Sequence, residues 1–362
     1  MTDFEQYLRQ RIALDGPVTV ERYMSLCLGH YYGTRDPLGR RGDFTTAPEI
    51  SQMFGELVGL WAAETWSFMG RPAPCRLIEL GPGRGTLMSD ALRSAQVLPG
   101  FREILQVHLV ETSPVLRQRQ EAALAGSGIP VSWHPRVEDV PPGPALVIAN
   151  EFFDALPVRQ FVATERGWCE RLVGLADDGF TFGLRAEPEP LGQRPNELGD
   201  VLEIPAASTA VAQQLGRRLA CDGGAALIVD YGYEGPAFGD TLQALREHAF
   251  GHPLEAPGEA DLTTHVDFRL LARAAAGQGA RAHGPVTQAD FLEALGIGTR
   301  ADALKRRANP AQAEAIDRAL ERLTDRGEKG MGRLFKVLAL THPDLTAVPG
   351  LPAGVLQQAG SS

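Results

Sequence analysis

The stretch "IELGPGRGTLMSDALR", residues 78–93, decides the fold, because an apolar strand-like segment runs through a glycine loop into a helix-like segment. Gly81, Gly83 and Gly85 allow a tight turn and let the backbone approach a ligand closely. The stretch therefore predicts a ligand-binding turn after a buried strand of an α/β sheet.

The spacing of these glycines bears on which ligand is bound. A dinucleotide site is the first alternative, but it expects GxGxxG, whose last glycine seats the helix under a pyrophosphate. Here the spacing is GxGxG, Glu79 precedes the loop and Pro82 interrupts it. The arrangement resembles the first motif of class I S-adenosylmethionine methyltransferases, in which a carboxylate faces the amino-acid end of the cofactor.

The rest of the chain follows the α/β pattern. Short β-type runs occur at 75–80, 106–111, 130–133, 145–150 and 225–232, and four of these five are nearly continuous in apolar residues, as strands covered on both faces must be. We also expect a helix at about 205–220, a strand at 280–286 and a closing strand in "RLFKVLAL". Alternating, Gly-interrupted sequence at 161–199 predicts an inserted antiparallel hairpin or meander.

Helix starts are predicted by capping-box spacing. Thr46 and Glu49, with Pro48 between them, predict the start of a helix that ends near Gly70. Its inward face carries Ile50, Met53, Phe54, Leu57 and Trp61 at helical spacing. The pairs Thr264–Asp267 and Thr287–Asp290 have the same spacing, so His265 is interpreted as a helix-start residue rather than a catalytic base.

Composition limits the class of protein. The chain has 362 residues, 44% apolar content and a net charge of −10, which argues against a nucleic-acid partner because phosphate binding needs a basic face. Four cysteines lie far apart without zinc-site or disulfide spacing, so no metal is expected. No apolar run reaches about 18 residues, which predicts no membrane span, and no signal peptide is visible. The bacterial cytoplasm is the expected location.

Glu111 ends the run "QVHLVE" and supports an adenosine cofactor. An acidic residue there can accept both hydroxyls of a ribose, although it can also precede the helix that Ser113 and Pro114 predict. Because NAD and S-adenosylmethionine both contain ribose, the presence of Glu111 does not distinguish between these two cofactors. Thr112 follows it and is included among the expected cofactor contacts. The adenine is expected beyond the third strand, near Trp133 and His134, although a tryptophan at a strand end is usually part of the core.

Several segments together resemble one family, the MidA-like methyltransferases. The segments are "GDFTTAPEISQMFGE", "IELGPGRGTLMSDALR", "ANEFFDALPVRQF", "LIVDYG", "ADLTTHVDF", "GPVTQADFLEALGI" and "MGRLFKVL", and they extend from about residue 4 to 340. The resemblance implies a Rossmann-like class I methyltransferase fold with a seven-stranded, mostly parallel sheet, S-adenosyl-L-methionine as cofactor and a protein arginine as substrate. Mitochondrial members assemble respiratory complex I in the matrix and dimethylate an arginine of a core subunit.

The resemblance also implies a domain organisation. We expect an N-terminal helical extension at 1–70 and a methyltransferase core at 71–160 and 200–345. The inserted hairpin at 161–199 and a second insertion at 233–263 are expected to form a substrate lobe. A homodimer is compatible with this arrangement.

The acids after the fourth strand are the expected catalytic residues. Ligands bind beyond the carboxyl ends of strands in open α/β sheets, and "ANEFFDALP" places Asn150, Glu151 and Asp154 there. A guanidinium stays protonated and is well matched by carboxylates, so we expect Glu151 to orient a substrate arginine, Asp154 to be the second carboxylate and Asn150 to hold cofactor or substrate. The alternatives are that these acids cap a following helix or pair with Arg159. Other arginine methyltransferases bracket arginine with two glutamates, and "NEFFDALP" departs from that pattern.

Further candidates lie nearby. Thr45 and Thr46 are expected cofactor contacts in a segment from Asp43 that leads into a helix. Asp230 and Tyr231 end the fifth strand, where either could touch substrate or complete the core. A cofactor-binding assembly factor without turnover and a small-molecule N- or O-methyltransferase are the alternative functions, and an NAD dehydrogenase is more distant.

Overall fold

The computed structural model describes residues 2–34, 46–177 and 179–352. The chain forms two compact units. We call the first the lobe, made of Met1–Phe44, Asp154–Ala210 and Gly235–His265, and the second the sheet unit, made of Thr45–Phe153, Val211–Glu234 and Val266–Ser362. In the described ranges, no helix is long and apolar enough to cross a membrane.

The sheet unit is built on an eight-stranded sheet. Seven strands run in the order β15-β16-β10-β5-β2-β3-β4, and β14 pairs with β10 beside this path. Only β16 is antiparallel to its neighbours, so the predicted seven-stranded, mostly parallel sheet is confirmed, with a two-residue strand added. The bounds are β2 Cys75–Leu80, β3 Leu105–Val110, β4 Val131–His134, β5 Ala145–Asn150, β10 Gly224–Tyr233, β14 Val266–Asp267, β15 Arg281–Thr287 and β16 Phe335–Thr341.

The strand order fixes where a ligand can bind. Chain connections run outward from β2 through β3 to β4 and then return to β5 on the other side of β2. Such a reversal leaves a crevice at the carboxyl ends of the two central strands, where open α/β sheets bind their ligands. In this chain that crevice lies between the loop after β2 and the loop after β5.

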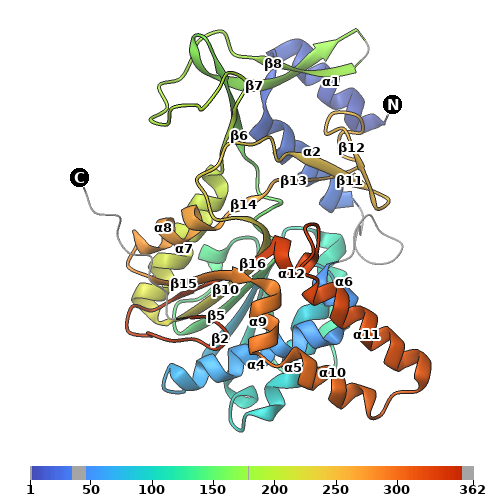
Figure 1. Cartoon of the computed structure of the whole chain (residues 1–362), viewed down its shortest axis with the longest axis vertical. Coiled ribbons are helices and arrows are strands. Elements are labelled where there is room, and N and C mark those ends of the chain that lie inside the picture. Colours follow the sequence, from blue (N-terminus) through green and yellow to red (C-terminus); the bar gives the residue numbers. More distant parts are fainter. Residues whose placement is uncertain (1, 35–45, 178, 353–362) are drawn as a thin grey trace. The chain divides into compact units, whose positions relative to one another are not determined.

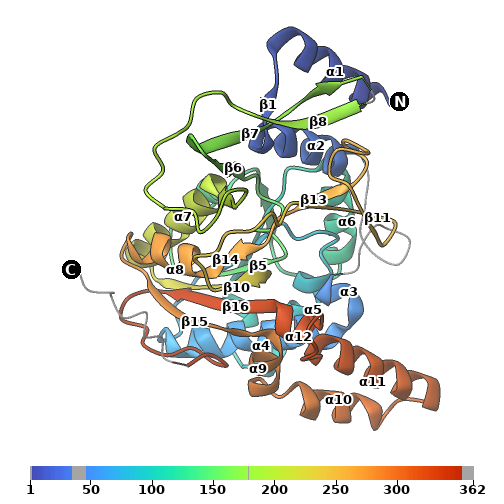
Figure 2. The ribbon, with the colours of Figure 1, turned by 45° about the horizontal axis from the view of Figure 1, so that its top comes forward.

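Helices cover both faces of the sheet (Figures 1 and 2). One face carries α4 Gln52–Phe68, α5 Thr86–Ser94 and α9 Gln288–Ala294, and the other carries α7 Ala206–Asp222 and α8 Phe268–Ala276. The remaining helices of this unit are α3 Ala47–Ile50, α6 Pro114–Leu124, α10 Ile297–Lys305, α11 Pro310–Thr324 and α12 Met331–Leu334, with short 3-10 turns at Ala95–Val97, Arg102–Ile104 and Val137–Asp139. The helix expected at 205–220 and the strand expected at 280–286 are confirmed.

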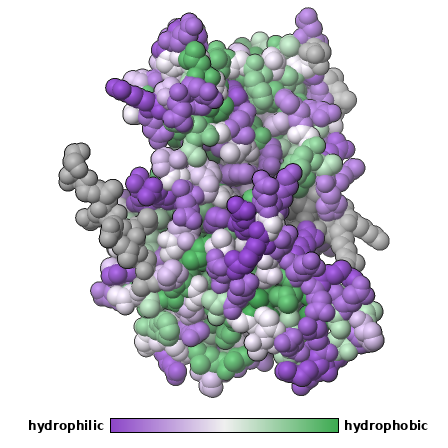
Figure 3. Space-filling view, in the orientation of Figure 1, coloured by the Kyte–Doolittle hydropathy of each residue, from purple (hydrophilic) through white to green (hydrophobic). Residues whose placement is uncertain are grey.

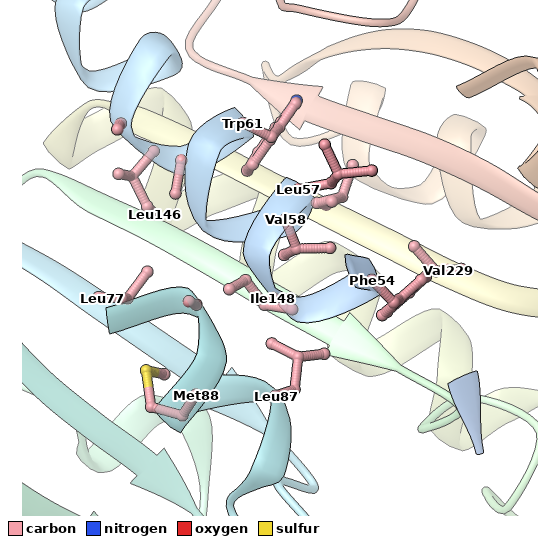
Figure 4. Packing of buried hydrophobic residues seen from close by; sticks show 14 of the residues in the cluster. Phe54, Leu57, Val58, Trp61, Leu77, Leu87, Met88, Leu146, Ile148 and Val229 are labelled. Atoms are coloured by element: carbon pink, nitrogen blue, oxygen red, sulfur yellow. The ribbon is translucent and has the colours of Figure 1, made fainter. Parts of the chain in front are cut away.

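The main core lies between α4, α5 and the sheet. Figure 4 shows Phe54, Leu57, Val58 and Trp61 of α4 gathered with side chains of the sheet and of α5. The predicted inward face of this helix is therefore confirmed, since Met53, Phe54, Leu57 and Trp61 are buried. Burying side chains of this size provides roughly 1.5–3 kcal/mol each, so this layer is a major source of stability.

Gly59 allows the close approach of α4 and α5. A Cβ atom at this position would lie 2.5 Å from the backbone of Ala91. We expect Gly59→Ala to lower the free energy of unfolding by about 2 kcal/mol through overpacking. Urea titration monitored by circular dichroism measures this. Gly29→Ala, in a helix with open space around the glycine, is the control and should be neutral or stabilising, and equal effects of both changes would contradict the prediction.

The lobe is a separate antiparallel structure. Strands β1 Val18–Thr19, β6 Arg159–Thr164, β7 Gly167–Ala176, β8 Gly179–Leu184 and β9 Val201–Ile204 form one sheet, and β11 Gln243–Arg246, β12 Ala249–Gly251 and β13 Asp261–Thr263 form another. The helices α1 Asp3–Asp15 and α2 Val20–Thr34 complete it. The antiparallel meander predicted at 161–199 is confirmed by the β6–β7–β8 pairing.

The surface mixes polar and apolar side chains. On the face in Figure 3, hydrophilic residues are interspersed with hydrophobic ones. The most exposed large apolar side chains, Leu14, Phe250 and Val97, come from distant parts of the sequence. Single exposed apolar residues of this kind are normal for globular proteins.

Candidate functional site

The glycine loop after β2 has the conformation that its sequence predicts. Gly81, Gly83 and Gly85 have φ angles of 58°, 52° and 83°, which side-chain-bearing residues rarely adopt. A Cβ atom on Gly81 would lie 3.0 Å from the ring of Phe152. Within the loop, the Gly85 N–H donates to the carbonyl of the buried Pro82 at 2.8 Å, and Gly85 is the N-cap residue of α5. The loop is thus a tight strand-to-helix turn at the sheet crevice.

Two buried acceptors on the central strands lack donors from the described part of the chain. Glu79 is only 3% exposed, and its Oε2 atom has no hydrogen-bond partner among the described residues. Burial raises the pKa of Glu79 to about 8, against a smaller lowering by the Met88 N–H. Asn150 at the end of β5 is 8% exposed, and its Oδ1 atom likewise lacks a donor in the described ranges. Because β2 and β5 pair with Glu79 opposite Ile148, Glu79 and Asn150 lie on the same face of neighbouring strands.

Glu111 directly follows β3 and is held by donors on both oxygens. Its Oε1 accepts from the Ser113 N–H at 2.7 Å and its Oε2 from Gln120 at 3.0 Å. Burial raises the pKa of Glu111, and these bonds and one from the Thr112 backbone oppose the rise. The following helix α6 is capped by the Ser113 hydroxyl, which accepts from Leu116, with Pro114 in its first turn. The predicted helix entry is therefore confirmed, and its capping side chain is Ser113.

Sequence reasoning missed Gln120, which connects three of these elements. Its Nε2 donates to the Gly83 carbonyl at 2.7 Å and to Glu111 at 3.0 Å, and its Oε1 accepts from the Trp133 indole at 2.9 Å. The side chain is fully buried. The sequence did contain a signal for this role. Gln120 lies at helical spacing between Leu116 and Leu124, on the inward face of the helix that starts beside Glu111. Gln120 positions the glycine loop, the ribose-type carboxylate and Trp133 relative to one another.

We expect Gln120→Leu to weaken binding of S-adenosylhomocysteine by about 10- to 100-fold, because the Gly83 carbonyl, the Glu111 carboxylate and the Trp133 indole all lose their bond to Gln120. Isothermal titration calorimetry measures the change. Gln118→Leu, on the exposed side of the same helix, is the control. Unchanged affinity in a folded Gln120→Leu chain would mean that Gln120 serves only the core.

The expected adenine side is part of the protein's packing. Trp133 packs against the main core and lies under the Arg117 guanidinium, 5.1 Å from its ring centre. The neighbouring His134 bonds His108, with 3.0 Å between Nδ1 of His108 and Nε2 of His134. Trp133 is thus a half-buried residue that packs against the core and also bonds Gln120.

Glu151 has a strained backbone at the end of β5. Its φ is 49°, in the left-handed region that costs about 1–3 kcal/mol for a residue with a side chain. Its Oε1 accepts from the Ala47 N–H at 3.1 Å and from the Asn150 amide at 3.2 Å, and its own N–H donates to the Val229 carbonyl. Strained, partly buried acids of this kind occur at functional sites more often than elsewhere.

The alternatives for the acids after β5 are wrong. No helix begins between β5 and β6 in the described ranges, so neither Glu151 nor Asp154 caps one there. Arg159 pairs with Glu170 and Glu189, at 2.7 Å each. Glu151 instead bonds the first N–H of α3, a helix that precedes it by about a hundred residues.

Asp154 belongs to the lobe, whereas Asn150 and Glu151 belong to the sheet unit. It is 6% exposed, and its carbonyl accepts from the Thr264 N–H at 3.0 Å. Within the lobe, burial raises the pKa of Tyr32 well above its usual value, with the charges of Asp261 and Asp154 adding to the rise. Asp154 therefore lies in a buried acidic environment of its own unit.

Two of the three capping-box predictions are corrected. Thr46 precedes α3, but its side chain accepts no capping bond; Glu49 accepts from the Thr86 hydroxyl at 2.5 Å instead. The long helix starts anew at Ser51, whose hydroxyl accepts from Met53. Helix α8 is capped by Asp267 rather than Thr264. The Thr287 prediction is confirmed, since its hydroxyl accepts from the Asp290 N–H.

The other candidates have these positions. Asp43 and Thr45 lie outside the described residues. Asp230 is fully buried and accepts from the Phe153 and Tyr231 N–H groups, so it orders the loop after β5. Tyr231 packs on Phe335 at the edge of the core. His265 precedes α8 and its N–H donates to Thr241 within the lobe.

The geometry suits a cofactor that brings hydrogen-bond donors. Glu79 and Asn150 each present a buried acceptor, and Glu111 is a carboxylate held in place at the neighbouring strand end. S-adenosylmethionine carries an ammonium group and two ribose hydroxyls, which supply the donors that these atoms need. No group of three or more His, Cys, Asp or Glu side chains within the described part of the chain could hold a metal ion.

Comparisons with known proteins identify the family. A sequence profile of S-adenosyl-L-methionine-dependent methyltransferases matches residues 57–286. The human protein arginine methyltransferase NDUFAF7, mitochondrial, is 37% identical over 372 residues, covering 94% of this chain and 83% of the human protein. The Drosophila melanogaster homologue of NDUFAF7 is 39% identical over 370 residues, covering 92% of this chain and 83% of the fly protein.

A solved structure agrees with the sequence comparisons. A protein from Burkholderia thailandensis bound to S-adenosyl-homocysteine has a TM-score of 0.79 and 29% identity, covering 96% of this chain and 93% of that one. The resemblance seen in the motifs is confirmed, the cofactor is S-adenosyl-L-methionine, and the dehydrogenase alternative is wrong. This chain belongs to the S-adenosyl-L-methionine-dependent methyltransferase family that includes the mitochondrial protein arginine methyltransferases NDUFAF7.

Proposed function

We propose that this chain transfers a methyl group from S-adenosylmethionine to a guanidinium nitrogen of a protein arginine. The observation that carries the proposal is Glu151, a carboxylate on strained backbone at the end of β5, beside the donor-less Asn150 oxygen. The names of the relatives support the substrate class, since they are protein arginine methyltransferases.

The proposed chemistry needs positioning more than a base. The cofactor supplies a methyl group on a sulfonium, which is a good leaving group. Glu151 would hold the protonated guanidinium by charge-assisted hydrogen bonds and localise its positive charge away from the attacking nitrogen. That nitrogen forms the new bond to carbon as the carbon–sulfur bond breaks, and it then releases a proton to solvent. Correct orientation of the reacting atoms supplies much of the rate gain in such reactions.

The cofactor would be held by groups already in place. We propose that Gly81, Pro82, Gly83 and Gly85 form the turn against which it lies, that Glu79 and Asn150 accept from its amino-acid end, and that Glu111 accepts from its ribose. Thr112, exposed beside Glu111, and Thr45 and Thr46 remain predicted contacts.

We propose that the client is a protein and that it is a core subunit of respiratory complex I, which the family resemblance implies. The lobe, which contains residues 161–199 and 235–263 of the two predicted insertions, is proposed to bind it, with Asp154 as the second carboxylate. A bacterial cytoplasmic location and a homodimer remain predictions.

A label-transfer experiment tests the proposal. The purified chain is incubated with tritiated S-adenosylmethionine and a lysate, and the protein fraction is hydrolysed to amino acids. Tritium in methylated arginine is the expected result. Label in small molecules would favour a small-molecule methyltransferase. A chain that binds cofactor and a client but never transfers label would be an assembly factor without turnover.

A further inference from the structure

A cluster of basic side chains lies on the face of the sheet opposite the main core. We call Arg76 of β2, His108 of β3, His134 of β4 and Arg218 of α7 the Arg–His cluster. Leu77, Val107, Leu109 and Trp133 pack with the main core, and side chains alternate along a strand, so Arg76, His108 and His134 point to the other face. All four residues belong to the sheet unit.

An irregular segment, rather than a helix, covers this cluster. Between β4 and β5 the described chain contains only the 3-10 turn Val137–Asp139. Arg218 Nη1 donates to the Val140 carbonyl at 3.0 Å, and its Nη2 donates to the Pro141 carbonyl. A Cβ atom on Gly143 would lie 2.2 Å from Nη1 of Arg76, so the covering backbone lies directly against that guanidinium. The covering segment therefore packs directly on this half-buried cluster.

The positive charges of the cluster have few counter-charges. Across the described ranges, no carboxylate lies within 4.0 Å of Arg76 or Arg218, and the Arg76 guanidinium has no hydrogen-bond acceptor. The cations also repel one another. Burial lowers the pKa of His108 to about 4, and the charges of His134, Arg76 and Arg218 lower it further. Burial also lowers the pKa of Arg218; Asp222 opposes this shift and Arg76 adds to it. Burial lowers the pKa of His134, and Asp139 opposes that shift.

Three nitrogen atoms of the cluster lack partners. They are Nε of Arg76, Nε of Arg218 and Nε2 of His108, all buried and without a hydrogen bond to any described residue. His108 itself is only 6% exposed. If His134 donates to Nδ1 of His108 across their 3.0 Å contact, Nε2 of His108 keeps its proton and becomes a third donor. Buried donors without acceptors are rare in proteins, so each requires an explanation such as a bound ion or water.

We propose that the Arg–His cluster binds a small oxyanion of the inorganic phosphate type. An oxyanion offers several acceptor oxygens and a negative charge, so it satisfies the donors and offsets the repulsion between the two guanidinium groups. The unpartnered nitrogens of Arg76 and His108 are separate from the expected cofactor contacts, because Arg76 and His108 lie on the sheet face opposite Glu79 and Asn150. The proposal does not depend on the proposed methyl transfer.

Thermal melting of the full chain in phosphate tests this, with saturating S-adenosylhomocysteine present to occupy the cofactor site. Phosphate, sulfate, chloride and phenyl phosphate are compared at equal ionic strength. We expect phosphate and sulfate to raise the melting temperature in a saturable way, as a ligand of the native state does. Chloride should have little effect because it has no acceptor oxygens. Phenyl phosphate should have a smaller effect than phosphate, because its ring would have to displace the covering backbone that lies against Arg76.

The variant that tests the cluster is Arg76→Gln. This change breaks no hydrogen bond or ion pair to any described side chain, and it relieves the charge repulsion between Arg76 and Arg218. It should melt at or above the wild-type temperature without phosphate and need at least about tenfold more phosphate for the same shift. Arg307→Gln, an exposed arginine of the same unit, is the charge-matched control and should respond as the wild type does. No phosphate shift in the wild type, or an equal shift in Arg76→Gln, would overturn the proposal. Equal shifts from all four anions would indicate general salt stabilisation and would also overturn it.

Discussion

A Glu151→Gln chain is expected to bind S-adenosylhomocysteine as the wild type does but to transfer methyl groups at least about 100-fold more slowly. The amide keeps an oxygen that can accept from Ala47 and Asn150, so the local structure is retained. It loses the negative charge that would hold the guanidinium during transfer, and removing one such group typically costs 100- to 1000-fold in turnover. Single-turnover label transfer and calorimetry measure the two quantities separately.

The matched variant is Asp154→Asn, which changes a second carboxylate in the same manner. If Asp154 also binds the substrate guanidinium, this variant loses turnover. If Asp154 only stabilises the lobe, turnover is retained. The proposal for Glu151 fails if Glu151→Gln retains full turnover. It also fails if cofactor affinity falls as far as turnover does, because the carboxylate would then act by holding the start of α3.

Much of the sheet unit could be predicted from the sequence. Continuous apolar runs identify buried parallel strands, and β2, β5 and β10 lie where these runs occur. The glycine loop was also predictable, because positive φ angles at three close positions strongly favour glycine. Local chemistry decides these features, so a single sequence carries them.

Features that depend on distant partners could not be predicted. The Thr46–Glu49 spacing predicts a capping box, but Glu49 turns to Thr86 of α5 and the carboxylate of Glu151 bonds the first N–H of α3. These partners are 37 and 104 residues away in sequence. Gln120 was missed for the same reason, since its importance comes from Gly83, Glu111 and Trp133 meeting around one side chain.

The position of Glu151 was predictable, but its strain was not. The end of the fourth strand follows from the apolar run, whereas a φ of 49° at a glutamate is set by the surrounding sheet unit. Together with the donor-less Asn150 oxygen, this strain strengthens the functional interpretation of Glu151. For Asp154 the structure provides burial within the lobe and no comparable strain.

The affinity for S-adenosylmethionine is expected to rise with pH up to about 8 because of Glu79. The Glu79 carboxyl has a pKa of about 8 while it lies buried without a donor on Oε2. If the cofactor's ammonium pairs with the ionised form, binding lowers this pKa and releases a proton. The dissociation constant should then fall by up to tenfold per pH unit from near neutrality to about 8 and level off above it. Glu79→Gln should remove this dependence and weaken binding at pH 8.

Calorimetry at several pH values, in buffers of different ionisation enthalpy, counts the released protons directly. Methylthioadenosine, which lacks the amino-acid end, is the matched ligand and should bind without proton release.

The same pKa shift also affects the folding stability of the chain without cofactor. Because the folded pKa of Glu79 lies above its usual 4.5, the folded state holds the proton more tightly, so stability is largest below pH 4.5 for this group and declines as the pH rises towards 8. Glu79→Gln should flatten that decline in urea titrations. Proton release that persists in Glu79→Gln would assign the linkage to another group and refute this role for Glu79.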